Sequence, residues 1–279
     1  MGIVIANIIA IYRRELQSYF VSPLAYGIAS AFWFLAGLFF VMILLGPKGI
    51  LVTVSSYDFQ GQQMGVPAPT IDVPYEFVRA FLGLYIIEGT GGGMGWLMLF
   101  ILPILSMGLY AEERKRGTLE LLATSPITNW AVAVGKLLGV LTFFLTMILP
   151  LMGLEAIALS NSNPPISPII PILGHLGLLL LAAAILSLGM FISSLTDSTI
   201  LSAVLTFALV ILLLFIDLIA KAIPGPIGEA VSHLSLLKHY NTLIQGIFDT
   251  SGLILFASYI ILGIFLTAQS IDALRFQRQ

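Results

Sequence analysis

One short stretch of this apolar chain concentrates charge and could contact a partner protein. The sixteen residues Ala111–Pro126, AEERKRGTLELLATSP, contain six of the 26 formally charged residues of the chain. Burying these groups in hydrocarbon would be costly, so the stretch is expected to lie in water or against a wet protein surface. The charged residues of this cluster are Glu112, Glu113, Arg114, Lys115, Arg116 and Glu120.

The order of residues in the cluster predicts a short helix between two helix boundaries. Gly117 favours a helix end because glycine adopts left-handed backbone geometry at low cost, and the preceding helix is expected to run through Arg116. Thr118 can cap the next helix, where Glu120 would lie near the positive end of the helix dipole, and Ser125–Pro126 would end that helix. Its apolar contact face consists of Leu119, Leu121 and Leu122. A solvated loop would explain the basic residues but not the helix end, the helix cap and the leucine face. Residues 111–130 are therefore predicted to form a docking element.

The rest of the sequence offers few groups for catalysis. There is no cysteine, which excludes thiolate metal sites and cysteine nucleophiles. The glycine-rich run Gly89–Gly95 lacks the Lys-Ser/Thr of a P-loop, so the chain is not expected to bind ATP by that route. His175, His233 and His239 are far apart in the sequence. We therefore expect no catalytic residues, metal site or cofactor in this chain, and no enzyme activity of its own.

Two carboxylates, Glu155 and Asp217, are placed near the ends of apolar runs. Ionisable residues inside membrane spans often mark a path for substrate or ions, and pairing at a helix interface is the alternative for both residues. The middle of the spans carries almost no charge, which argues against a carrier driven by protons or sodium.

Composition places the chain among all-α integral membrane proteins. Of its 279 residues, 58% are hydrophobic and 9% are charged, and the mean hydropathy is +1.04. Ordinary soluble domains carry about 25% charged residues. A helix needs about 20 apolar residues to cross a bilayer. Six segments meet this requirement: Leu24–Gly46, Gly95–Tyr110, Val132–Leu159, Ile169–Leu195, Ile200–Ala220 and Leu253–Ser270.

Basic residues predict how these six helices are oriented, because cytoplasmic loops carry an excess of Lys and Arg. With the N-terminus in the cytoplasm, eight basic residues lie on that side and four on the other. The eight are Arg13, Arg14, Arg114, Lys115, Arg116, Lys136, Arg275 and Arg278. The four are Lys48, Arg79, Lys221 and Lys238. Both termini and the charged cluster are therefore predicted to be cytoplasmic, and the net charge of −2 does not indicate a nucleic-acid partner.

Three segments outside the spans complete the predicted single transmembrane domain, 1–279. Residues 1–22 are expected to form an amphipathic helix at the membrane interface, which Ser22-Pro23 ends. Residues 47–92 are expected to form an irregular outer loop with one short helix near Tyr75–Leu84. Residues 221–251 mix apolar and polar residues and are expected to form short helices that re-enter the membrane from the outside.

These residues together resemble the ABC-2 type exporter permeases. The resemblance is carried mainly by Glu112–Leu122, Ser125-Pro126 and Gly135-Lys136, with Arg14-Glu15-Leu16 and His239-Tyr240 as weaker matches. It extends over nearly the whole chain and is greatest for the gliding-motility-type subgroup, which also has members unrelated to gliding.

The resemblance implies a role for several segments. Leu119–Thr124 would be the coupling helix that seats in a groove of a separate ATPase subunit, where ATP and Mg would bind. The 1–20 helix would be the interfacial connecting helix. His239 and Asp249 would lie in a re-entrant element near the outer exit. Two permease subunits, identical or different, would pair with two ATPases in the inner (plasma) membrane, surrounded by lipid.

The function implied is the membrane permease subunit of an ATP-binding-cassette exporter, with the substrate left open. The alternative is an ATPase-driven scaffold or mechanical transmitter that acts on an extracytoplasmic protein without moving solute. The length of the predicted outer loop is the feature that favours this alternative.

Overall fold

A computed structural model describes residues 2–67, 70–84, 92–119 and 127–276 of the chain, with side chains to residue 273. All regular secondary structure in this part of the chain is helical. The helices are α1 (Gly2–Val21), α2 (Pro23–Leu45), α3 (Ile50–Met64), α4 (Val73–Leu82), α5 (Met94–Ser106), α6 (Ala111–Lys115), α8 (Asn129–Ser160), α9 (Ile169–Leu195), α10 (Thr199–Ala222), α11 (Pro226–His233), α12 (Leu236–Ile244) and α13 (Thr250–Phe276).

The predicted membrane architecture is confirmed. Six helical segments within the described residues are long and apolar enough to cross a membrane: 23–64, 94–115, 129–160, 169–195, 199–222 and 250–273. The fourth matches its predicted bounds, and the second, third, fifth and sixth differ from theirs by one to five residues at each end. The first continues beyond its predicted end through α3 to residue 64. Ser22-Pro23 separates α1 from α2 as expected, since proline is favoured in the first turn of a helix.

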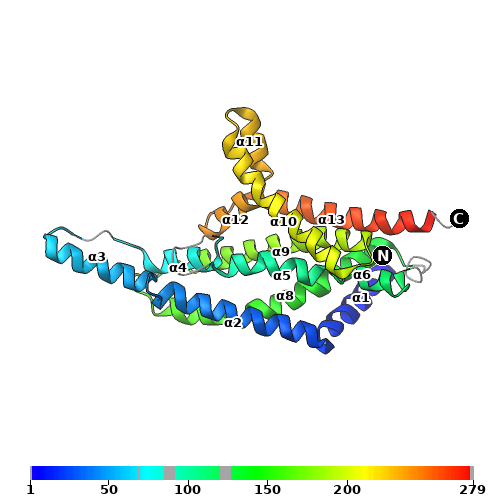
Figure 1. Cartoon of the computed structure of the whole chain (residues 1–279), viewed down its shortest axis with the longest axis horizontal. Helices are drawn as coiled ribbons and strands as arrows, with labels where there is room; N and C mark the ends of the chain where they lie inside the picture. Colours follow the sequence, from blue (N-terminus) through cyan, green and yellow to red (C-terminus); the bar gives the residue numbers. More distant parts are fainter. Residues whose placement is uncertain (1, 68–69, 85–91, 120–126, 277–279) are drawn as a thin grey trace.

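Helix α9 forms the centre of the bundle. It contacts α4, α5, α8, α10, α12 and α13, and most of its residues are buried. Helices α1 and α6 and the last turns of α13 lie at one end of the long axis, and α3 and α4 lie at the other (Figure 1). We call these the α6 end and the α4 end. The polar residues discussed below gather at these two ends.

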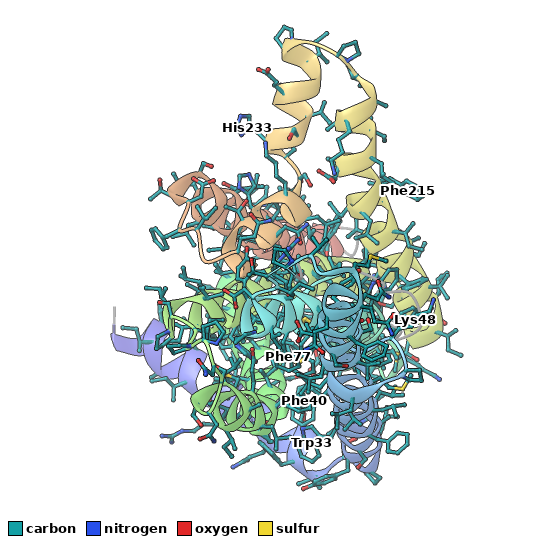
Figure 2. The ribbon with its side chains drawn as sticks, turned by 90° about the vertical axis from the view of Figure 1, so that its left-hand side faces the viewer. Trp33, Phe40, Lys48, Phe77, Phe215 and His233 are labelled. Atoms are coloured by element: carbon teal, nitrogen blue, oxygen red, sulfur yellow. The ribbon has the colours of Figure 1, made fainter. Side chains whose placement is uncertain are left out.

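The segment between the first two spans is more regular than predicted. Instead of an irregular loop it forms α3, which continues the direction of α2, and α4, which was anticipated as a short helix (Figure 1). Two of its prolines lie at helix boundaries and do not interrupt the helices, because Pro47 precedes α3 and Pro74 lies in the first turn of α4. Phe77 of α4 packs edge-on against Phe40 of α2, with ring centroids 5.1 Å apart (Figure 2).

Helices α10 and α11 leave the bundle together. Only one side of α10 is buried against the bundle, and the end of α10 projects sideways with α11 (Figures 1 and 2). Residues 221–251 thus contain two short helices, as expected. Helix α12, the second of them, packs on α9 with buried Tyr240, Leu243 and Ile244.

Candidate functional site

The predicted helix end at Gly117 is present. Gly117 has a φ of 69°, which is left-handed geometry. The Gly117 amide donates to the Arg114 carbonyl (3.1 Å) and the Thr118 amide donates to the Glu113 carbonyl (2.9 Å). This pair of bonds is the Schellman motif, which closes a helix by satisfying its last carbonyls. The Thr118 hydroxyl also donates to the Glu113 carbonyl (3.2 Å), and this hydrogen bond further stabilises the end of α6.

The helix before Gly117 is not continuous, contrary to expectation. Helix α5 ends at Ser106, residues 107–110 form a turn, and α6 begins at Ala111. This break leaves the amides of Tyr110 and Ala111 without their usual helical acceptors. The Ser193 Oγ of α9 accepts from both amides, at 3.1 and 3.0 Å, and donates to the Met107 carbonyl at 2.8 Å. One buried hydroxyl on α9 therefore holds the turn between α5 and α6.

Replacing Ser193 with Ala is expected to lower the free energy of unfolding by about 2 kcal/mol, because two buried amides lose their acceptor. The measurement is unfolding of the purified protein in mixed micelles with increasing SDS. Ser258→Ala is the matched control, since Ser258 is exposed and its hydroxyl donates to the Ile254 carbonyl of its own helix. Equal stability of the two variants would contradict the role given to Ser193.

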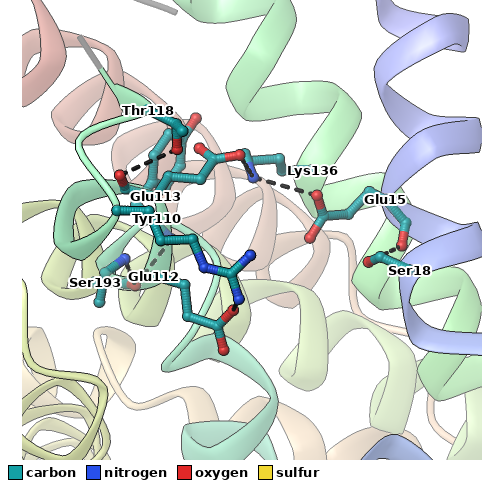
Figure 3. A network of polar contacts seen from close by, with 10 residues as sticks. Glu15, Ser18, Tyr110, Glu112, Glu113, Thr118, Lys136 and Ser193 are labelled. Atoms are coloured by element: carbon teal, nitrogen blue, oxygen red, sulfur yellow. Dashed lines mark hydrogen bonds and ion pairs between the residues drawn. The ribbon is translucent and has the colours of Figure 1, made fainter. Parts of the chain in front are cut away.

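A buried lysine connects α6 to two other helices. Lys136 of α8 lies 3.0 Å from Glu113 of α6 and 3.2 Å from Glu15 of α1 (Figure 3). The Lys136 side chain is only 5% exposed, and the carboxylate side chains are 18% and 16% exposed. The ammonium group also lies 5.0 Å from the centre of the Tyr110 ring, within the range of a cation–π contact. Three helices therefore meet at one ammonium group.

Helix α1 approaches α8 closely at two glycines. A Cβ on Gly135 would meet the Ile11 side chain at 2.8 Å, and a Cβ on Gly139 would meet the Glu15 side chain at 2.8 Å. Small residues four apart on one helix face permit such approach between helices in membranes. The glycines therefore bring Glu15 within reach of Lys136, which lies between them in the sequence.

The charged cluster is thus divided between solvent and protein. Glu112 and Arg116 are exposed and form an i,i+4 ion pair at 3.5 Å. Glu113 faces Lys136, and the Arg114 guanidinium donates to the Ser194 carbonyl of α9 at 2.7 Å. Glu113 and Arg114 therefore use their charges to attach α6 to the bundle, whereas Glu112 and Arg116 face solvent.

Only part of the predicted coupling helix falls in the described region. Leu119 is helical and 2% exposed, so its side chain packs against the protein. The remaining coupling residues of the prediction lie outside the described residues: Glu120, Leu121, Leu122, Ser125 and Pro126. Thr128 precedes α8 in an extended conformation, and no bond from its side chain caps the helix. The coupling role of the cluster stays a prediction.

Toward the α4 end, the other candidate residues form separate groups. Glu155 of α8 faces His175 of α9, with Oε2 and Nε2 3.3 Å apart, and both side chains are buried. His239 of α12 lies 3.2 Å from the Asp249 carboxylate. The Ser251 hydroxyl and amide also donate to Asp249, and these bonds lower the pKa of its carboxyl. Asp217 lies on α10, where it pairs with Lys221 at 2.6 Å.

Sequence reasoning missed the role of three residues in these groups. Glu15 and Lys136 were noted only as parts of a motif or a charge count, and His175 was not treated as a partner of Glu155. The spacing Gly135–x3–Gly139 around Lys136 was an available signal, since it marks a close helix contact. No local signal pairs Glu155 with His175, because helix rotation decides which side chains meet.

Comparison with known proteins gives one result. A family model described as "ABC-2 family transporter protein" matches residues 25–279. No curated protein matched the chain. The matched range contains all of the six candidate spans of the described residues except the first two positions of α2, and it includes α6 and Lys136.

Proposed function

Since the chain belongs to the ABC-2 transporter family, we propose that it is the permease of an exporter driven by a separate ABC ATPase subunit. Family membership makes it the membrane component of an ABC transporter and not the ATPase itself. The main structural support for this proposal is the attachment of α6 to the rest of the bundle. Ion pairs and hydrogen bonds fix this short helix to α8 and α9, and through Lys136 to α1, at one end of the bundle. A force applied beside Gly117 would reach these helices directly.

The proposed mechanism uses this attachment. ATP binding closes the ATPase subunits, which press on the segment that follows Gly117. Because Glu113 and Lys136 join α6 to α8, and Ser193 joins the preceding turn to α9, the pressure tilts spans and does not bend a loop. The α6 end is cytoplasmic in this proposal, the membrane is the inner (plasma) membrane, and the path opens at the α4 end. The family match does not favour the mechanical transmitter considered above, since the matching description is of a transporter.

The complete complex would contain a second permease subunit, either another copy of this chain or a relative. Helix α10 exposes large apolar side chains, which lipid or a second subunit would cover. These are Ile200, Val204, Leu212, Phe215 and Leu218. Co-expression of two differently tagged copies decides between the two arrangements. Joint purification of both tags indicates a homodimer, and purification of one tag alone indicates a different partner.

Single-cysteine crosslinking tests the docking surface. The chain has no cysteine, so each introduced thiol is unique. A photo-crosslinker on Arg116→Cys, an exposed position beside Gly117, is expected to form an adduct with an ABC ATPase subunit in native membranes. The matched control is Gln62→Cys, an exposed position on α3 that should give no such adduct.

The same two variants test the orientation. A membrane-impermeant maleimide should label Gln62→Cys on intact cells, and Arg116→Cys only after the membrane is opened. An ATPase adduct at position 62, or external labelling at position 116, would overturn the proposed assembly.

A further inference from the structure

Glu155 and His175 leave three buried polar atoms without partners. Glu155 is 1% exposed and His175 is 4% exposed. Both carboxylate oxygens of Glu155 and the Nε2 of His175 lack a hydrogen-bond partner, although Oε2 and Nε2 are 3.3 Å apart. Buried polar atoms without hydrogen-bond partners are uncommon, because they reduce the stability of the fold. Their presence in this pair therefore has to be explained, for example by a ligand that supplies the missing hydrogen bonds.

The three atoms are all hydrogen-bond acceptors when the imidazole is neutral and the carboxyl is ionised. The His175 Nδ1 lies 2.9 Å from the Pro171 carbonyl oxygen. Since a carbonyl oxygen can only accept, Nδ1 must carry the hydrogen of this bond, and Nε2 of the neutral ring is then an acceptor. The site therefore needs donors, and it needs up to three of them.

Glu155 and His175 line a cavity of about 410 Å³. The other residues that line the cavity are largely apolar and come from α8, from α9 and from the segment between these helices. They include Met152, Ala156, Leu159, Ile166 and Ile172. Among the described residues that line it, none is a lysine or arginine that could neutralise the carboxylate. A volume of this size suits a small organic molecule.

We propose that this cavity is a binding site for an apolar molecule that carries a protonated primary amine. An ammonium group has three N–H donors and no acceptor, which complements the two oxygens of Glu155 and the Nε2 of His175. Its positive charge would compensate the buried carboxylate, and charge-assisted hydrogen bonds are stronger than neutral ones. The apolar body of the ligand would contact Met152, Leu159 and Ile172.

A series of compounds with one shape and different polar groups tests this site. The probes are 1-adamantylamine, 1-adamantanol and adamantane-1-carboxylate, titrated calorimetrically into the purified full-length chain. The amine is expected to bind about tenfold or more tightly than the alcohol, because only the amine brings a positive charge to the Glu155 carboxylate and three N–H donors. The carboxylate is expected not to bind.

Variants then locate the binding. Glu155→Gln should weaken amine binding about tenfold or more and weaken alcohol binding much less, and retained alcohol binding also shows that the cavity is intact. Asp217→Asn is the matched control, because it removes a carboxylate on another span that pairs with Lys221, and it should leave amine affinity unchanged. Ile172→Trp, at a position 60% exposed at the edge of the cavity, should block both amine and alcohol.

Several results would overturn the proposal. These are equal affinity for amine and alcohol, binding of the carboxylate, an equal loss in Asp217→Asn, or no binding of the amine at all. The experiment uses the permease without an ATPase, so its failure would leave the proposed ATPase coupling in place.

Discussion

Replacing Lys136 with Met is expected to lower the free energy of unfolding by about 3–5 kcal/mol, the cost of removing one partner from a buried ion pair. The substitution leaves the carboxylates of Glu15 and Glu113 in a mostly buried site without their common cation. Helix α1 would lose its ion pair with α8, and α6 would lose its ion pair with the same helix. Unfolding in mixed micelles with increasing SDS measures the change.

Two further variants distinguish the loss of this cation from a general loss of stability on any substitution in this region. Lys115→Met makes the same substitution at an exposed position of α6 and should change stability by only about 0.5 kcal/mol or less. The triple variant Glu15→Gln, Glu113→Gln, Lys136→Met removes every charge of the group and should recover most of the loss, because a fully neutralised site holds no uncompensated charge. A triple variant less stable than Lys136→Met would refute the electrostatic explanation.

Gly117→Val is expected to uncouple the membrane subunit from its ATPase. The left-handed conformation at φ 69° costs an L-residue about 1–2 kcal/mol, and valine is among the residues least suited to it. A penalty of this size lowers the population of the present helix end about 5–30-fold. The segment after Gly117 would then leave α6 in another direction and would no longer transmit force to α8 and α9.

Uncoupling can be measured without knowing the substrate. In the complex, ATP is expected to change the maleimide labelling rate of Gln62→Cys at the α4 end. Adding Gly117→Val should abolish this change while ATP hydrolysis continues. Gly117→Asn is the control, since asparagine adopts left-handed geometry more readily than other non-glycine residues and should retain most of the response. An unaltered ATP response in Gly117→Val would show that this helix end does not carry the coupling.

The positions of the spans and of the main helix boundaries could be predicted from the sequence. Long apolar runs give the six spans, Ser22-Pro23 gives the start of α2, and Gly117 gives the end of α6. These features depend on residues close together in the chain, through hydropathy, proline geometry and the tolerance of glycine for positive φ. The failure to predict α3 had a related cause, because prolines beyond its ends were interpreted as signs of an irregular loop.

The pairing of polar residues was decided only by the tertiary structure. Lys136 meets Glu15 across 121 positions of sequence, and Ser193 meets Tyr110 across 83. Whether such residues touch depends on the rotation of each helix about its axis and on its depth beside its neighbours. Packing of the whole bundle sets these quantities, and a shift of one residue turns a helical side chain by about 100°. The sequence alone thus determined that this is a six-span membrane protein with a charged cluster, and the fold determined which of those charges hold the bundle together.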